Sequence, residues 1–453
     1  MVMLLAVSAI AARSSAVHGS PPIAAREMLA APTAEELRYG HAVAARDGWL
    51  AVASPMLDDD AAGLGAVDLY RLAADDAGPR ARLVARIAGR ERFAGFGAAV
   101  AIARAEGEGL AARGFEGDGL EVGGLEGASL EIAVGCPARD GGAGAVEVHL
   151  VRQDGVVVAQ PPPVPRSAEQ GCEFGATLAL DPNWLVVGAP RASVGGRFDA
   201  GRVSVFTRGE SPPRGWIHAY DISAPEASES AQFGAALSLH DGVLAVGAPR
   251  ARVVGPEGDE LASAGEVAVY RLGRTGAAHL ATLRAPKPAR WARFGSSIAG
   301  DGPLLAVGAD GDECGGVRTG AVHVFDVSRA AAPRHLRRLA PPAESRTVGM
   351  GFGAAVAMQG PLLLAGAPGT DRWIGPDSSL ATTEDSGTAW LLDALAGAVL
   401  AELAAPEPLD MGLYGSAVAL GATAGGASAA FVGHRFVAEE ATGTHAGVGV
   451  YGR

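Results

Sequence analysis

Aromatic side chains, basic charge and cysteines are all scarce in this chain of 453 residues. Aromatic residues make up 5% of the sequence although 48% is apolar, so any core must be built from Ala, Val and Leu, which suits many thin, regular strands. Lys and Arg number 37 against 50 Asp and Glu, which gives a net charge of −13. That balance excludes the basic footprint of a nucleic-acid-binding protein.

The three cysteines, Cys136, Cys172 and Cys314, are too few for a disulfide framework in a chain this long. One pair could form and leave an odd thiol. We expect small buried thiols instead, because free cysteine is among the residues most often found in protein interiors.

Long apolar runs are also missing, and the one near the start, Met1 to Ala12, is too short to span a bilayer. Its length suits the apolar region of a signal peptide, and Ala9-Ile10-Ala11 resembles a cleavage site. No Lys or Arg precedes the run, so a disordered N-terminus is the alternative. We therefore expect residues 1–23 to be a signal peptide or disordered, with no membrane span in the chain.

Catalytic signatures are absent as well. The sequence contains no His-x-x-x-His pair, no Gly-x-Ser-x-Gly elbow, no Cys-x-x-Cys pair and no phosphate-binding loop, and its ten histidines are scattered. The glycines at 349, 351 and 353 belong to a repeat and do not open a βαβ unit. The sequence therefore predicts a protein that is not an enzyme, with no cofactor, no catalytic residue and no bound metal.

What the chain has in abundance is a repeat. An aromatic residue followed by glycine marks each copy, and the spacing between marks is near 60 residues. The seven marks are Tyr39-Gly40, Phe96-Gly97, Phe174-Gly175, Phe233-Gly234, Phe294-Gly295, Phe352-Gly353 and Tyr414-Gly415. A period of this length indicates a solenoid, a propeller or another repeat array.

Within a copy, the residues read as four short strands. Residues 353–368 hold two apolar runs around a tight turn, and other copies place Asp-Gly or Asp-Pro-Asn at that turn, which predicts a β-hairpin. A third run, such as residues 320–325, alternates Val with other residues, and a more polar fourth run, such as residues 335–339, precedes the next mark. Four antiparallel strands repeated seven times predict an all-β, seven-bladed β-propeller. A helical solenoid is excluded because no segment shows a helical period.

The ends of the chain complement each other. The last copy stops after its third strand, whereas residues 24–31 resemble an orphan fourth strand. We therefore predict that residues 24–31 complete the last blade and that residues 24–453 form one propeller. Its blades start near residues 39, 96, 174, 233, 294, 352 and 414.

The sequence of marks, Phe-Gly, then Gly-Ala-Pro, then Gly-Ala-Val-x-Val-Phe, resembles the FG-GAP repeat of integrin α-subunit propellers and their bacterial relatives over residues 25–453. The resemblance implies a propeller and a role in adhesion. In that family an Asp-rich calcium loop often separates the first two strands, but here the turn has two to four residues in five copies. A calcium cage needs several oxygens on one loop, so we expect none.

Function is expected on the face that carries the long, variable loops. The candidate ligand-binding residues are Asp58, Asp59, Asp60, Arg191, Arg250, Asp310, Asp312, Arg372 and Trp373. Residues 310–313 could hold a hard cation or form a plain acidic turn. Trp373 has the character of a binding anchor, although it could instead pack against a neighbouring loop.

Three functional hypotheses follow from this sequence. The first is a secreted, monomeric propeller of the cell-adhesion type, extracellular, at the cell surface or in the periplasm. It binds a protein or a glycan, does not bind nucleic acid and has no membrane span. The second is a polysaccharide-acting hydrolase or lyase that uses the central channel on the long-loop face. The third is a module that serves a partner chain.

Overall fold

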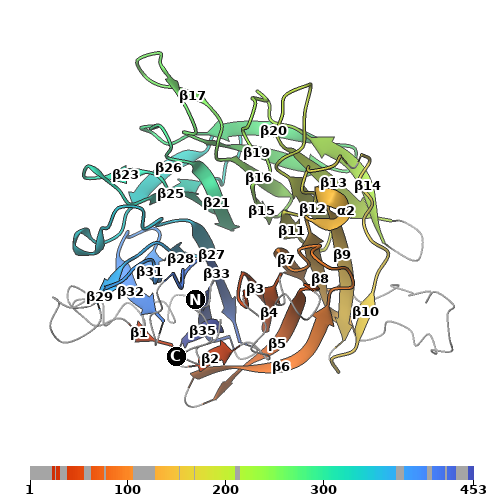
Figure 1. Ribbon diagram of the computed structural model, residues 1–453. Helices are drawn as coiled ribbons and strands as arrows, with labels where there is room; N and C mark the ends of the chain where they lie inside the picture. The colour runs from red at the N-terminus through yellow and green to blue at the C-terminus, as the bar shows by residue number, and fades with distance from the viewer. Residues whose placement is uncertain are drawn as a thin grey trace, which may run out of the picture.

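Seven β-sheets stand around a central channel in the computed structural model (Figure 1). The structure describes residues 23–25, 27–30, 38–55, 63–75, 78–105, 128–152, 154–167, 169–209, 215–373, 382–405, 411–423, 426–434 and 447–452. The predicted seven-bladed all-β propeller is confirmed. The innermost strand of each blade contacts the innermost strands of both neighbours, so these strands form the wall of the channel.

Each blade is a four-stranded antiparallel sheet, and in blades one to six the strands run outward from the channel in chain order. Blade one contains β3 (Ala42–Arg46), β4 (Trp49–Ser54), β5 (Ala66–Asp75) and β6 (Gly78–Ala88). Blade two contains β7 (Ala99–Ala103), β8 (Ala128–Cys136), β9 (Ala145–Arg152) and β10 (Val157–Ala159). Blade three contains β11 (Thr177–Leu180), β12 (Trp184–Ala189), β13 (Arg202–Arg208) and β14 (Trp216–Ile222). A short helical turn, α2 (Arg139–Gly142), joins β8 to β9.

Blades four to six repeat the pattern and add two-stranded hairpins on their loops. Blade four contains β15 (Ala236–His240), β16 (Val243–Ala248), β19 (Glu266–Gly273) and β20 (Gly276–Leu283). Blade five contains β21 (Phe294–Asp301), β22 (Leu304–Ala309), β25 (Ala321–Asp326) and β26 (Arg334–Leu339). Blade six contains β27 (Ala355–Gln359), β28 (Leu362–Ala367), β31 (Thr388–Asp393) and β32 (Val399–Ala404). The added hairpins are β17 (Val253–Val254) with β18 (Glu260–Leu261), β23 (Glu313–Cys314) with β24 (Val317–Arg318), and β29 (Arg372–Trp373) with β30 (Thr382–Thr383).

The two ends of the chain share blade seven. It contains β33 (Ala417–Ala422), β34 (Ser428–Gly433) and β35 (Gly447–Gly452), and its fourth strand is β2 (Glu27–Ala30), which pairs antiparallel with β35. This confirms the predicted closure and covers the edge that β35 would otherwise expose. The preceding strand, β1 (Ile23–Ala24), pairs in parallel with β32 of blade six. The N-terminal segment therefore contacts two blades, although the sequence predicted contact with one.

The repeated glycines hold neighbouring blades close together. The marker Gly353 donates its N–H to the carbonyl of Gly366 in its own blade, at 2.9 Å. A Cβ atom on Gly366 would lie 1.9 Å from the carbonyl oxygen of Gly415, the marker of the next blade. Gly433 of blade seven meets Gly40 of blade one at 2.2 Å in the same way. Glycine at the first position of Gly-Ala-Pro therefore lets adjacent blades approach closely in six copies, whereas blade one has Ala53 there.

The core fills the gaps between adjacent blades. One cluster joins Val186 and Val203 of blade three to Leu244 and Val246 of blade four, and all four are fully buried. Small aliphatic side chains dominate these layers, as the aromatic-poor composition predicts. In the part of the chain that the structure describes, no helix is long and apolar enough to cross a membrane.

A buried ion pair joins blades two and three. Glu131 of β8 has 1% of its side chain exposed and pairs with Arg208 of β13. The indole Nε1 of Trp216 donates to Glu131 at 3.2 Å, and the Arg208 guanidinium lies 3.8 Å from the centroid of the same Trp216 ring. These contacts compensate the burial of the carboxylate, which would otherwise carry a large desolvation cost.

The cysteines are free thiols. Cys136 and Cys172 are buried as predicted, and the Cys172 thiol donates to the carbonyl of Ala143 at 3.2 Å. Burial raises the pKa of Cys136 to about 12, with Glu147 acting in the same direction. Cys314 differs from the expectation, since it is only half-buried, in the β23–β24 hairpin.

Candidate functional site

The blades define two different faces. The hairpin face carries the tight turns between first and second strands, such as residues 47–48 and 241–242, and the turns between third and fourth strands. The long-loop face carries the connections from second to third strands and from one blade to the next. The predicted ligand-binding residues belong to the long-loop face, in the loops between second and third strands.

Arg191 and Arg250 occupy equivalent positions after the second strands of blades three and four. Arg191 lies 3.1 Å from Glu173 and 3.7 Å from Asp199, so its charge is balanced by neighbours at the blade junction. Arg250 is exposed, and its side chain has no hydrogen-bond or ion-pair partner among the described residues. Asp58, Asp59 and Asp60 lie outside the described residues.

Asp310 and Asp312 each pair with an arginine and do not form a shared cation site. Asp310 accepts from Arg293 at 2.9 Å, and burial raises the pKa of its carboxyl although Arg293 opposes the shift. Asp312 accepts from Arg338 at 3.0 Å and lies 3.5 Å from His323. Burial acts to raise the pKa of Asp312, but these two partners outweigh it and hold the pKa below its usual value.

Arg372 and Trp373 form strand β29, which pairs with β30 in the loop of blade six. Their side chains lie outside what the structure describes, so the role of Trp373 as an anchor stays a prediction. Among the described residues, no group of three or more His, Cys, Asp and Glu side chains is placed to hold a metal ion. The assignment of these residues as ligand contacts likewise stays a prediction.

A backbone ladder between adjacent blades fixes each inter-blade loop on this face. At the junction of blades four and five, the N–H groups of Trp291, Arg293 and Phe294 donate to the carbonyls of residues 262–264, at 2.9, 3.0 and 2.9 Å. The same ladder joins Met411 to Glu384 across blades six and seven, at 2.9 Å. The loop backbone is therefore held by its hydrogen bonds, whatever side chain it carries.

At the six junctions that the structure describes, the residue three positions before the marker aromatic has a positive φ, in the left-handed region. The residues there are Phe93 (φ 56°), Gly171 (76°), Ser230 (60°), Trp291 (64°), Gly349 (82°) and Met411 (56°). Glycine adopts this conformation freely, whereas other residues lose about 1–2 kcal/mol. A bulky residue at such a position is an outlier.

Three junctions nevertheless carry large apolar side chains at this position, and these side chains are exposed. Phe93 is 61% exposed, Trp291 53% and Met411 52%. Three further large apolar residues are exposed on the same face, namely Phe198 at 71%, Val254 at 66% and Val348 at 79%. We call Phe93, Trp291 and Met411 the anchor residues, because the ladder fixes their backbone.

Sequence reasoning missed the anchor residues. The signal was available in the alignment of the copies, because two junctions place glycine where others place Phe, Trp or Met. A position that has glycine in some copies and a bulky apolar residue in others indicates a backbone with positive φ, which the bulky residue adopts at a steric cost.

A second feature lies at the other end of the channel, on the hairpin face. A cavity of about 730 Å³ opens there, lined by residues from six blades. The sixth residue after the marker glycine lies at or next to the end of the innermost strand, on this face. In five blades this residue is polar: Arg46, Asp181, His240, Asp301 and Gln359. We call this region the channel mouth.

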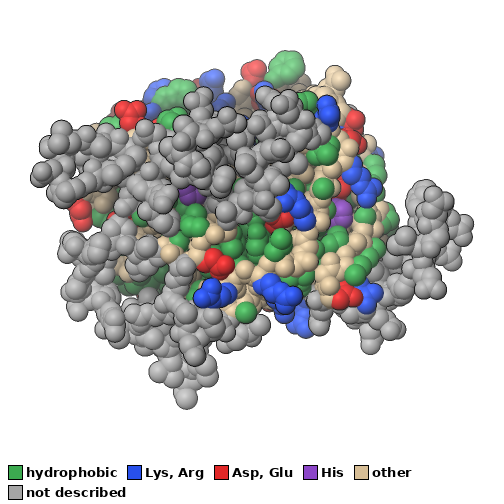
Figure 2. Space-filling view, turned by 60° about the horizontal axis from the view of Figure 1, so that its bottom comes forward, with side chains coloured by type: hydrophobic (Ala, Val, Ile, Leu, Met, Phe, Trp, Pro, Cys, Tyr) green, Lys and Arg blue, Asp and Glu red, His purple; other side chains and the backbone are tan. Residues whose placement is uncertain are grey.

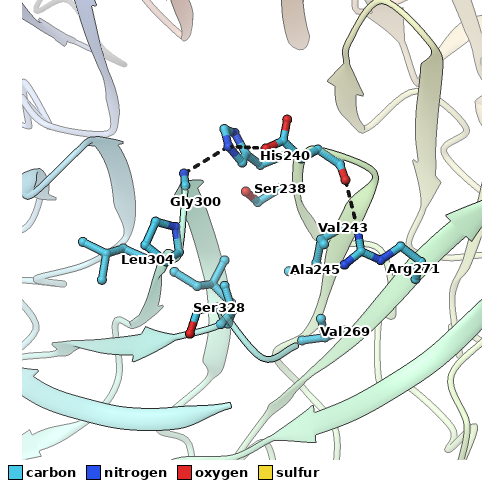
Figure 3. Close-up of a pocket in the computed structure, with 14 residues that line it drawn as sticks. Ser238, His240, Val243, Ala245, Val269, Arg271, Gly300, Leu304 and Ser328 are labelled. Atoms are coloured by element: carbon cyan, nitrogen blue, oxygen red, sulfur yellow. Dashed lines mark hydrogen bonds and ion pairs between the residues drawn. The ribbon is translucent and has the colours of Figure 1, made fainter. Parts of the chain in front are cut away.

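A smaller pocket of about 310 Å³ opens beside it, between blades four and five (Figure 3). His240 extends from blade four to the turn of blade five, where its Nε2 accepts the N–H of Gly302 at 3.1 Å. That bond leaves the ring proton on Nδ1. Arg271 donates to the carbonyl of Asp241 at 3.2 Å on the other side of the pocket.

Charges from several blades interact across the channel mouth. Burial raises the pKa of Asp181, which belongs to blade three. The negative charge of Asp241 in blade four also raises this pKa, while backbone N–H groups and Arg46 of blade one act to lower it. The turn that follows Asp181 holds its carboxylate in place, since Oδ1 accepts the N–H groups of Asn183 and Trp184 at 2.8 and 2.7 Å. The predicted use of the channel concerned the long-loop face, whereas the two cavities open on the hairpin face.

These observations define the class of protein as a seven-bladed β-propeller closed by its N-terminal strand. Residues 279–325, from β20 to β25, match the family model of the FG-GAP repeat, which confirms the resemblance seen in the sequence. No curated protein sequence matches the chain. Among solved structures, the periplasmic gluconolactonase of Pseudomonas aeruginosa is similar at 14% identity and a TM-score of 0.45, covering 84% of this chain and 97% of the other.

Proposed function

We propose that the protein is a non-catalytic, adhesion-type propeller that binds a protein partner through its long-loop face. The observation that carries this proposal is the set of anchor residues. Their backbone conformation favours glycine, yet Phe93, Trp291 and Met411 stand there exposed. Local strain of this kind persists when the surrounding structure enforces it, and it gathers at functional sites.

The position of the anchor residues favours a macromolecular partner. They lie at the junctions of blades one and two, four and five, and six and seven, so they are spread around the ring. A small ligand could not touch all three, whereas a protein partner could. Aromatic side chains with fixed backbones lose little entropy on binding and dominate protein interfaces.

The charged residues of this face support binding rather than catalysis. Asp310 and Asp312 are paired with Arg293 and Arg338, and Arg191 is paired with Glu173. Charged residues tied to neighbours in this way suit the rim of an interface. Figure 2 shows basic and acidic side chains interspersed on the part of the surface it displays. As part of the same proposal, the protein acts outside the cytoplasm, at the cell surface or in the periplasm.

The test is an array of extracellular proteins and glycans, probed with the wild-type chain and with Phe93→Ala and Trp291→Ala. Ile217→Ala is the matched control, because Ile217 is 58% exposed on the outer strand of blade three, away from the anchor residues. We expect binding to a protein that both anchor variants lose and the control keeps. Retention by both anchor variants, or turnover of an arrayed polysaccharide, would overturn the proposal.

A further inference from the structure

We propose that the channel mouth is a second binding site, for an acidic sugar whose carboxylate is held by Arg46 and Arg104. Arg46 ends the innermost strand of blade one, and Arg104 follows that of blade two, so adjacent blades bring the two cations to one rim. The cavity of about 730 Å³ falls in the usual range for small-ligand sites.

The two arginines have hydrogen-bonding capacity to spare. Arg104 is exposed, and its side chain has no partner among the described residues. Arg46 has 47% of its side chain exposed, and the nearest carboxylate, that of Asp47, lies 4.0 Å away. Arg71, by contrast, donates to the carbonyl of Asp47 at 3.2 Å and lies over the ring of Trp49. A bound carboxylate would therefore meet Arg46 and Arg104, since both have unused donors.

Two acids of the channel mouth are already engaged, which argues against a cationic ligand. Asp181 accepts two backbone N–H groups of its own turn. Oδ2 of Asp301 accepts the N–H of Gly360 at 2.6 Å, from the neighbouring blade. The chain as a whole is strongly acidic, so an arginine pair with spare donors is a local exception that attracts an anion.

Unused acceptors in the same cavity point to hydroxyl groups on the ligand. Oε1 of Gln359 has no hydrogen-bond partner among the described residues and is covered by its surroundings, so a ligand hydroxyl reaches it once the carboxamide turns toward the cavity. Oδ1 of Asp301 lies 3.9 Å from Nδ1 of His240, which leaves it able to accept a shorter bond. A ligand that carries both a carboxylate and hydroxyl donors satisfies the arginines and these acceptors together, and a sugar acid is the simplest such molecule.

Isothermal titration calorimetry with galacturonate tests the site. Galactose and the methyl ester of galacturonate lack the charge, and acetate lacks the hydroxyl groups. We expect galacturonate to bind and the three other probes to bind at least about tenfold more weakly, because each loses a set of hydrogen bonds. Arg104→Gln should weaken galacturonate binding by a similar factor. Gln359→Ala should weaken galacturonate without affecting acetate.

Arg250→Gln is the matched control, because Arg250 is an exposed arginine without a side-chain partner on the long-loop face. The inference is overturned if galacturonate gives no binding heat, if its ester or acetate binds as tightly, or if Arg250→Gln has the same effect as Arg104→Gln. The site does not depend on the proposed protein-binding face. Trp291→Ala should leave galacturonate binding unchanged, so failure of one proposal can be distinguished from failure of the other.

Discussion

Trp291 offers the sharpest test of the anchor residues, because its backbone and its side chain can be examined separately. Replacement by glycine and replacement by alanine both remove the indole ring. They differ in the backbone, which the ladder holds at a φ of 64°. Any difference in stability between the two variants therefore reports the strain at this position.

The magnitude follows from two opposing effects. Alanine in the left-handed region costs about 1–2 kcal/mol, a cost that glycine avoids. Glycine makes the unfolded chain more flexible, which costs about 0.4–1 kcal/mol in return. We therefore expect Trp291→Gly to be more stable than Trp291→Ala by about 0.5–1 kcal/mol. Urea denaturation of the two proteins, compared by their transition midpoints, measures this difference.

Ile217 is the control for which of the two variants, glycine or alanine, is the more stable. It lies in β14, within extended backbone, and it is exposed to a similar degree. Glycine is less favourable than alanine within a regular element, by roughly 0.5–1 kcal/mol. We therefore expect Ile217→Gly to be less stable than Ile217→Ala, the reverse of the order at Trp291.

The binding assay completes the argument. If Trp291 contacts the partner through its ring, its Gly and Ala variants should bind equally weakly although their stabilities differ. Removing a buried aromatic anchor at an interface costs about 2 kcal/mol or more, which is roughly a thirtyfold loss of affinity. Trp291→Gly being no more stable than Trp291→Ala would refute the strain argument. A binding difference between the two variants would refute the role of the ring.

Three further results are expected. Deleting residues 1–32 removes β2 and should lower the melting temperature, whereas an unchanged value would contradict the closure of blade seven. Arg208→Met leaves Glu131 buried without its cation and should cost about 3–5 kcal/mol in urea denaturation, while adding Glu131→Leu should recover much of that loss. Burial lowers the pKa of His434 to about 4, so the folded protein resists a proton that the unfolded chain accepts below about 6.5. Stability should therefore fall by about 3 kcal/mol between pH 6.5 and pH 4, and His434→Ala should flatten that decline in a pH series of melting curves.

The fold could be predicted from the sequence because its repeat signals mark close contacts between blades. Gly366 and Gly433 touch the marker glycines of the next blades, and six of the seven copies have glycine at this position. The closure was predictable because blade seven lacks a strand that residues 24–31 could supply. The pairing of β1 with blade six was not, since two residues in parallel pairing leave no pattern in the sequence.

The site residues were harder to predict, and the reason is geometric. The sequence shows that a loop is long and charged, but not whether a charge is already paired. Asp310 looked available for a ligand, yet Arg293 from the inter-blade loop reaches it at 2.9 Å. The interest of Trp291 lies in the positive φ of its backbone. The sequence indicates this φ only when the copies are aligned, because residues 171 and 349 at the same position are glycines.

Two positions in each copy, besides the long loops, lie at the ends of the channel. Blade spacing is set by backbone contacts such as that of Gly366 with Gly415, and the side chains between the blades form a closed core. The residue three before the marker projects from the long-loop face, and the residue six after the marker glycine ends a channel strand at the other face. Neither position belongs to the glycine contacts that set the blade spacing, so each can change without altering those contacts. A single repeat can therefore present independent sets of side chains at the two ends of one rigid channel, which is why the anchor residues and the channel mouth can serve different ligands.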